Sequence, residues 1–321
     1  MLKKETQSKS QTDKLEIKTN SPKAKKFSDL DLNDIKILLY GPYQSGKTYT
    51  IGELLELGLK ILYFSTDAGG SGLLTIRNYL RKKDRRDLEE NLIVFESKHI
   101  DTYDKLLNFL QRPDKYVEGL YDLDIDLVFW DGFSNFQADH VHNKVTENVN
   151  AAAAERDKDI TAAREAGMQF ETQDWGQVKA ATQKAANLFW KMHNKKTGQV
   201  WHKIITCQTS ATSKAVSQGS GSTTSIVEVK KPQISGQAAL SILAACDLII
   251  YTGFKKSPVG GKKDYFYITS ADDETVSKSR GFDLLDKEEA SMSKLWGKLT
   301  TQTGITTKAF DQSLIEEVEE E

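Results

Sequence analysis

The feature that most constrains this chain is a glycine-rich turn in residues 35–53, between an apolar run and a helix-forming run. The turn reads Gly-Pro-Tyr-Gln-Ser-Gly-Lys-Thr, which matches the G-x-x-x-x-G-K-T pattern of a phosphate-binding loop. Its glycines let backbone N–H groups point inward, where they and the N-terminus of the next helix attract phosphate oxygens. A turn that only resembles the pattern is the alternative. The apolar run 35–40 and the helical run 49–59 favour the phosphate loop, because they supply the strand–loop–helix setting that it needs.

The residues of this loop predict ATP and Mg²⁺ as cofactors. Lys47 is expected to bring its charge to the β- and γ-phosphates as a catalytic residue. The hydroxyl of Thr48 is an expected Mg²⁺ ligand. The predicted ATP contacts are nine consecutive residues, Gly41, Pro42, Tyr43, Gln44, Ser45, Gly46, Lys47, Thr48 and Tyr49.

Length and charge indicate one large core with charged ends. The chain has 321 residues and a net charge of −2, so a nucleic-acid site has to be a local basic patch. We expect a disordered basic arm at 1–27, a core at 28–300 and an acidic C-terminal tail at 301–321. Either simple solvation or weak contact with nucleic acid would explain the arm, and either solvation or docking would explain the tail.

The cysteines and the apolar runs predict the compartment. Cys207 and Cys246 lie in apolar runs with no Cys or His partner at ligand spacing, which predicts buried thiols in a reducing compartment. No apolar run approaches ~18 residues, and the first residues lack the hydrophobic core of a signal peptide. We therefore expect a soluble, cytoplasmic protein with no membrane partner.

Short apolar runs predict the strands of a mostly parallel sheet. Several of them lack period-two alternation, as expected for strands that are buried on both faces. Helical stretches separate the earlier runs, which predicts an α/β fold with helices on both faces of a twisted sheet. Pro and Gly-Gly in residues 254–263 predict a hairpin, so the sheet should end in an antiparallel edge. The predicted strands are residues 60–66, 91–96, 125–131, 203–210, 247–253 and 264–270.

Two segments of the core have an unusual composition. Residues 137–172 are rich in alanine and charge but poor in large apolar side chains, which predicts an exposed helical insertion, with low-complexity coil as the alternative. Residues 211–231 are rich in Gly, Ser and Thr, which predicts a long flexible loop. The helix expected at 175–193 has apolar side chains at three-to-four spacing and should pack on the sheet.

Two aspartates at strand ends are candidates for binding the metal and activating water. Asp131 ends the run Leu-Val-Phe-Trp-Asp, the Walker B pattern, and is expected to bind Mg²⁺ together with Thr48. Gly132 stands where many ATPases have a water-activating glutamate. We assign that catalytic role to Asp67, which follows the strand at 60–66, because ligands in such sheets bind at the carboxyl ends of strands. The alternative is that Asp67 caps the next turn.

The strand predicted at 203–210 ends in polar residues and is expected beside the phosphate-loop strand. Gln208 would then reach the γ-phosphate and report its presence to the flexible loop, although a strand-end glutamine without that role fits the sequence equally well. Lys214, Lys230 and Lys231 give the loop a basic edge, which predicts contact with the backbone of single-stranded DNA. The loop has no aromatic residue for base stacking, which weakens this interpretation.

The order of these motifs resembles the RecA-like core. The five motifs are followed by Pro-Gln-Ile-Ser-Gly at 232–236 and Cys-Asp-Leu-Ile-Ile at 246–250. The chain is most similar to the short bacteriophage versions, the phage nucleotide-binding AAA proteins related to Sak-type recombinases. In these proteins a Gln-Asp-Trp-Gly element, such as 173–176 here, precedes a long helix. The similarity covers roughly residues 35–285.

This resemblance implies a RecA-like P-loop NTPase that hydrolyses ATP and acts on single-stranded DNA in phage recombination, annealing or replication. It implies a homo-oligomer in the host cytoplasm with active sites at subunit interfaces, where Lys278 and Arg280 reach the γ-phosphate of the neighbour. A solvated turn is the alternative for these two residues. A phage single-strand-binding or replication protein is an implied partner. Two other functions stay open, a P-loop kinase of a nucleotide or small molecule and a non-enzymatic, ATP-switched adaptor in phage DNA replication.

Overall fold

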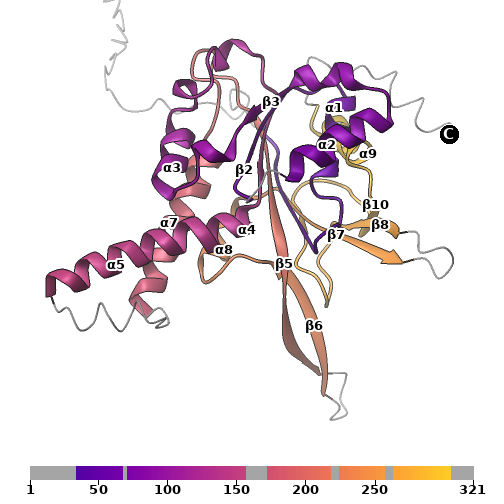
Figure 1. Cartoon of the computed structure of the whole chain (residues 1–321). Coiled ribbons are helices and arrows are strands. Elements are labelled where there is room, and N and C mark those ends of the chain that lie inside the picture. Colours follow the sequence, from indigo (N-terminus) through magenta and orange to yellow (C-terminus); the bar gives the residue numbers. More distant parts are fainter. Residues whose placement is uncertain (1–33, 68–70, 157–171, 218–223, 257–262, 305–321) are drawn as a thin grey trace, which may run out of the picture. The chain divides into compact units, whose positions relative to one another are not determined.

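The computed structural model describes residues 34–304, apart from 68–70, 157–171, 218–223 and 257–262 (Figure 1). Within these residues, eight strands of one sheet lie in the order β10, β8, β7, β1, β5, β4, β2, β3, while β6 pairs with β5 and β9 with β7. Their bounds are β1 Lys36–Gly41, β2 Ile61–Ser65, β3 Leu92–Phe95, β4 Leu127–Asp131, β5 His202–Ser217, β6 Thr224–Pro232, β7 Leu248–Lys256, β8 Lys263–Ile268, β9 Lys278–Ser279 and β10 Lys287–Glu289.

The centre of the sheet is parallel and one edge is antiparallel. β1 pairs in parallel with β5 and β7, and β4 pairs in parallel with β5 and β2. β8 pairs antiparallel with β7 and β10, which confirms the predicted hairpin, although its residues 257–262 lie outside the described part. The architecture is therefore the predicted α/β fold, a mostly parallel sheet with an antiparallel edge. Strand β5, which includes Gln208, lies between the phosphate-loop strand β1 and the Walker B strand β4.

Helices cover both faces of this sheet. Alternate strand residues point to opposite faces, so that Leu38 and Tyr40 join a core with α3, α5, α7 and α8, while Ile37 and Leu39 join a core with α1, α2 and α9. The helices are α1 Tyr49–Glu56, α2 Ser71–Lys82, α3 Tyr103–Gln111, α4 Phe133–Asn135, a π-helix Phe136–Val141, α5 His142–Arg156, α7 Thr172–Trp190, α8 Ala238–Ala245 and α9 Met292–Thr303. Short 3₁₀ helices span Arg86–Asn91, Ser97–His99, Pro113–Lys115 and Leu120–Asp122.

The segment predicted as an exposed insertion, residues 137–172, is helical where it is described, but one of its faces is buried. Val141, Val145 and Val149 recur every four residues and all belong to the core. A helix needs only one apolar stripe to pack, so three valines bury this face despite the polar composition. The prediction of exposure is correct for the opposite face, which includes Glu147. The residues between α5 and α7 lie outside the described part.

The residues predicted as a flexible loop, 211–231, instead form two strands. β5 continues to Ser217 and pairs antiparallel with β6, from Thr209 opposite Pro232 to Ser217 opposite Thr224. This ribbon, residues 209–217 and 224–232, extends beyond the rest of the sheet (Figure 1). Its flanks are rich in Thr and Val, which favour strands, whereas the glycines fall in 218–223, outside the described part. The loop prediction is wrong because it treated the whole stretch as one composition, although the glycines are confined to 218–223 and the flanks contain strand-forming residues.

The predicted basic arm at 1–27 lies outside the described residues, as do residues 305–321 of the predicted acidic tail. Residues 301–303 continue helix α9 rather than beginning the tail. No described helix is both long enough and apolar enough to cross a membrane.

Candidate active site

The phosphate loop joins β1 to α1, as the sequence predicts. Gln44 and Gly46 have left-handed backbone conformations, with φ of 63° and 91°, so the chain folds tightly between the strand and the helix. The Nζ of Lys47 donates to the carbonyl oxygens of Gly41 at 2.8 Å and Pro42 at 2.9 Å. Burial lowers the pKa of Lys47, and the nearby charge of Asp131 partly offsets this effect. The loop thus holds its own cation, which can exchange these carbonyls for phosphate oxygens.

Strand β7 contacts the phosphate loop through Thr252. The hydroxyls of Ser45 and Thr252 lie 2.6 Å apart. A Cβ added at Gly41 would lie 2.2 Å from the carbonyl oxygen of Thr252, so only glycine fits at the start of the loop. The first glycine of the motif is therefore required by the neighbouring strand as well as by the turn.

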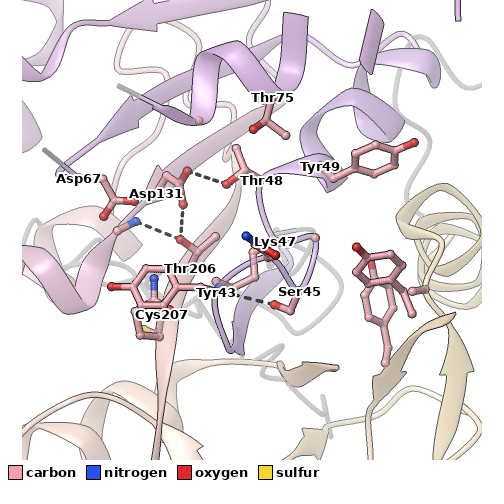
Figure 2. A pocket seen from close by; sticks show the side chains of 18 residues that line it. Tyr43, Ser45, Lys47, Thr48, Tyr49, Asp67, Thr75, Asp131, Thr206 and Cys207 are labelled. Atoms are coloured by element: carbon pink, nitrogen blue, oxygen red, sulfur yellow. Dashed lines mark hydrogen bonds between the residues drawn. The ribbon is translucent and has the colours of Figure 1, made fainter. Parts of the chain in front are cut away.

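Thr48 and Asp131 meet, as predicted for a metal site. The hydroxyl of Thr48 donates to Oδ2 of Asp131 at 3.0 Å (Figure 2). Two more hydroxyls fix the carboxylate, because Tyr63 donates to Oδ2 at 3.2 Å and Thr206 donates to Oδ1. Carboxylate and hydroxyl oxygens beside a phosphate loop are ligands that Mg²⁺ prefers. The residues present therefore fit this ion.

Asp67 lies beside this pair, just beyond the carboxyl end of β2. Its Oδ1 accepts a hydrogen bond of 2.6 Å from the Nδ2 of Asn135. The pKa of Asp67 is raised to about 6, mainly by burial and also by the charge of Asp131, while Lys47 and the Asn135 hydrogen bond partly offset this rise. A Cβ added at Gly132 would lie 2.0 Å from Oδ1 of Asp67. Any side chain after the Walker B aspartate would therefore displace Asp67, which explains why that position carries no glutamate.

Gln208 lines the same cavity, at the point where the ribbon leaves the sheet. Its backbone N–H donates to Oγ of Ser134 at 2.9 Å. Its side-chain Oε1 is buried and has no hydrogen-bond partner among the described residues. Such an atom is costly to leave unpaired, and a ligand that donates a hydrogen bond would satisfy it.

These groups line one cavity of about 650 Å³. Figure 2 shows Asp67 and Asp131 at one side, Tyr49 at the other side and Lys47 between them. Three further tyrosines of the lining are Tyr43 of the loop and Tyr265 and Tyr267 of β8. Charged groups together with flat aromatic rings match the phosphates and the flat base of a nucleotide. Of the nine predicted ATP contacts, the residues from Tyr43 to Tyr49 line the cavity, whereas Gly41 and Pro42 hold Lys47.

Several residues of the site were not predicted from the sequence. Thr206 also accepts the backbone N–H of Gly132 at 3.0 Å, so it fixes both residues at the end of β4. The sequence could have indicated Thr206, because it lies two residues before Gln208 on the strand beside Walker B. No sequence pattern indicated Asn135 or the aromatic residues on β8, because their contributions depend on how distant segments meet.

Lys278 and Arg280 do not line the cavity of this chain. The Nζ of Lys278 donates to the carbonyl oxygens of Leu243 and Ala244, each at 3.2 Å, and a guanidinium nitrogen of Arg280 donates to Ala244 at 2.9 Å. Both cations therefore cap the C-terminus of α8, where the helix dipole favours positive charge. The side chain of Arg280 is nevertheless exposed, and a role in a neighbouring subunit stays a prediction.

The three lysines predicted to bind DNA belong to the ribbon. Lys214 faces Val227 in the pairing, and Lys230 and Lys231 lie near the root on β6. The Nζ of Lys230 lies 3.6 Å from a carboxylate oxygen of Glu274 and 5.6 Å from the ring centre of Tyr251. Part of its charge is thus already neutralised within the chain.

Comparisons with known proteins give a loose likeness. No model of a protein family matches the chain, and no curated protein matches it. Among solved structures, the flagellar accessory protein FlaH from Methanocaldococcus jannaschii aligns with 73% of this chain and 78% of its own, at 14% identity and a TM-score of 0.34. The KaiC-like protein PH0186 from Pyrococcus horikoshii aligns with 72% and 77%, at 10% identity and 0.36. The RadB recombinase aligns with 73% and 87%, at 15% identity and 0.34.

Likenesses of this size assign no function to the chain. The fold class rests on the molecule itself, with the phosphate loop after β1, the Walker B aspartate at the end of β4 and β5 between these two strands. Together these features define a P-loop α/β fold with a mostly parallel sheet and an antiparallel edge.

Proposed function

We propose that the protein is a Mg²⁺-dependent ATPase. The observation that carries this proposal is the contact of Thr48 with Asp131, within one cavity that also contains Lys47 and Asp67. These are the cation, the two metal ligands and the acid that phosphoryl transfer to water requires. Thr48 and Asp131 would hold the Mg²⁺, which when bound supplies positive charge to the phosphate oxygens.

In this reaction the protein contributes charge, orientation and a proton acceptor. Lys47 neutralises phosphate charge in a partly desolvated site, where such an interaction is stronger than in water. Asp67 accepts the proton of the attacking water, for which its carboxyl has to be ionised. A base with a pKa near 6 is mostly ionised at neutral pH, yet it binds a proton more readily than an ordinary aspartate does. Gln208, which lines the cavity, would contact the γ-phosphate through its amide nitrogen, which is the hydrogen-bond donor of that side chain.

We also propose that the ribbon binds single-stranded DNA, in phage recombination, annealing or replication. Support comes from its shape and its charge. A two-stranded ribbon outside the core gives a long accessible surface, and Lys214, Lys230 and Lys231 supply cations for a phosphate backbone. A homo-oligomer is part of the same proposal, because the cavity of one chain contains Lys47 as its lysine and no arginine among its described lining residues. Arg280, with Lys278, would supply the missing cation to a neighbouring subunit.

The experiment that tests the ATPase proposal is a steady-state turnover assay on the wild-type chain and on Asp67→Asn, with and without an oligo-dT single strand. We expect Asp67→Asn to bind ATP as the wild type does and to turn over at least about a hundredfold more slowly, because it lacks the proton acceptor. Asp273, an exposed aspartate outside the cavity lining, serves as the control through Asp273→Asn. Normal turnover in Asp67→Asn would contradict the assignment. Phosphate transfer to a small molecule, without release of phosphate to water, would favour a kinase instead.

A further inference from the structure

A short helical segment after the Walker B strand contacts Asp67, which lines the cavity, and the residues at the root of the ribbon. It comprises α4 and the π-helix, residues 133–141, and runs into α5 without a break. π-helical turns are rare and are frequently found at functional sites. Phe133 and Phe136 are fully buried, so the segment is anchored in the core.

One contact of this segment fixes the proposed water-activating residue. Asn135 donates from Nδ2 to Oδ1 of Asp67 at 2.6 Å. On the other side Asp67 lies against Gly132, whose backbone has a φ of 85°. The carboxylate of Asp67 thus lies between the side-chain amide of Asn135, which belongs to the segment, and the backbone of Gly132. A shift of the segment changes where Asp67 points.

The residue before Asn135 holds the root of the ribbon. The Oγ of Ser134 accepts the backbone N–H of Gln208 at 2.9 Å and donates to the carbonyl oxygen of Gln233, also at 2.9 Å. The N–H of Gln233 in turn donates to the carbonyl oxygen of Gln208 at 2.8 Å. Ser134 therefore bridges the two strands of the ribbon where they leave the sheet.

A second side chain of the segment, Gln137, accepts a hydrogen bond from the chain just beyond the ribbon. Gln137 is 2% exposed. Its Oε1 accepts the backbone N–H of Ser235, and its Nε2 donates to Thr182 of α7 at 3.1 Å. The amide is therefore satisfied on both atoms, and it connects the segment to α7 and to the chain just after the ribbon. Such a buried, fully paired network has few alternative arrangements.

We propose that Asn135 is the positioning residue for Asp67 and that segment 133–141 couples the nucleotide cavity to the ribbon. Occupation of the cavity then changes the ribbon, and by reciprocity a ligand on the ribbon changes the affinity of the cavity. This inference rests on the proposed ATPase function. Catalytic geometry is sensitive enough for such control, since a displacement of about 1 Å costs on the order of 10²-fold in rate.

The first test separates positioning from a merely structural role. Asn135→Ala removes the donor, and Asn135→Asp keeps the shape but replaces the donor by a second carboxylate beside Asp67. We expect both variants to lower kcat by about tenfold or more and to leave KM within about threefold, because the phosphate loop is untouched. Asn143→Ala, an exposed asparagine of α5, is the matched control. The positioning role would be overturned if KM rose by the same factor as kcat fell. Wild-type turnover in both variants would overturn it as well.

The second test follows the ribbon by hydrogen exchange, with Mg²⁺ and the slowly hydrolysed analogue ATPγS as the probe. In the wild-type chain we expect the amides of residues 209–217 and 224–232 to change their exchange rates by about threefold or more when ATPγS binds. Ser134→Ala, which removes both contacts at the ribbon root, should abolish most of this change while ATPγS still binds. Asn143→Ala should behave as the wild type does.

The outcomes are distinguishable. A wild-type chain that binds no ATPγS would overturn the proposed function and this inference together. A wild-type chain that binds ATPγS without any change in ribbon exchange would overturn the coupling alone. The coupling would equally be overturned if Ser134→Ala, with an unchanged melting temperature, kept the full response.

Discussion

The cavity and the ribbon are built on the same strand, β5, yet they differ in how the chain supports them. Near the cavity, β5 lies between β1 and β4, and its residues Ile204 and Ile205 are fully buried. Beyond Thr209 it has β6 as its partner, and Ile226 on that partner is 77% exposed. Isolated two-stranded ribbons are marginally stable in water. The stability of this ribbon therefore depends on the contacts at its root.

This difference indicates how the two regions can work together. The cavity needs side chains fixed to within a fraction of an ångström, which burial on two faces provides. The ribbon is less buried than the cavity, and regions with less burial open at a lower free-energy cost. Two contacts connect the cavity region to the ribbon. One is made by Ser134 at the root, and the other by the hydroxyl of Tyr40, which donates to the carbonyl oxygen of Lys230 at 3.2 Å.

The largest effect is expected from the cation that the cavity lacks. Arg280→Ala should lower ATP turnover by roughly 10³-fold or more, the usual contribution of an arginine that acts from a neighbouring subunit. Specific activity of the wild type should rise with protein concentration as subunits assemble. An equal mixture of Arg280→Ala and Asp67→Asn should regain activity, because some interfaces pair an intact Asp67 with an intact Arg280.

The exposed Arg81 of α2 provides a control for this prediction through Arg81→Ala. A specific activity that does not depend on concentration, together with no rescue in the mixture, would show that one chain contains the whole site. The cap on the C-terminus of α8 would then be the function of Arg280.

A smaller loss is expected from the phosphate loop. Lys47→Ala removes the ammonium group that now binds Gly41 and Pro42, so turnover should fall by roughly 10²- to 10³-fold and ATP should bind more weakly. Calorimetry and a phosphate-release assay measure the two effects. The melting temperature of the variant should stay near that of the wild type, and undiminished turnover would refute the ATPase proposal.

The binding of DNA by the ribbon should depend on the salt concentration. Replacing Lys214, Lys230 and Lys231 by alanine should weaken oligo-dT binding by about tenfold and make the slope of log affinity against log salt less steep by roughly 2. Fluorescence anisotropy at several salt concentrations measures both quantities. A control that replaces three exposed lysines elsewhere, Lys115, Lys184 and Lys191, should leave the slope unchanged. Equal effects of the two triple variants would place the DNA elsewhere.

The smallest effect is expected in the pH dependence of stability, through Glu53, which contacts the start of α9. Burial raises the pKa of Glu53 from 4.5 to about 7, although its Oε2 accepts the N–H of Met292 at the start of α9. The folded state therefore binds more protons than the unfolded state between these values, so the stability falls as the pH rises from 4.5 towards 7. Glu53→Gln removes this titration.

We expect Glu53→Gln to gain stability relative to the wild type by on the order of 1 kcal/mol between about pH 5 and pH 8. Urea unfolding at the two pH values measures this change, and Glu90→Gln, on an exposed residue, is the control. A stability difference between variant and wild type that is the same at both pH values would show that Glu53 titrates normally.

The sequence by itself determined the parts of this protein that depend on local chemistry. The phosphate loop, the Walker B aspartate and the hairpin between β7 and β8 each follow from a short run of residues. The strand runs were correctly placed because strands buried on both faces have to be apolar at successive positions. The parallel order followed from the helices between them, since parallel strands need long crossovers.

Only the tertiary structure decided which distant groups meet. The contact of Asn135 with Asp67 joins residues 68 positions apart, and that of Thr206 with Asp131 joins residues 75 positions apart. The ribbon was missed for a related reason, because a polar strand gains its stability from the partner that it pairs with and not from its own composition. Local patterns specify which backbone conformations a segment prefers, whereas hydrogen bonds between side chains depend on distances that only the packed sheet and helices fix.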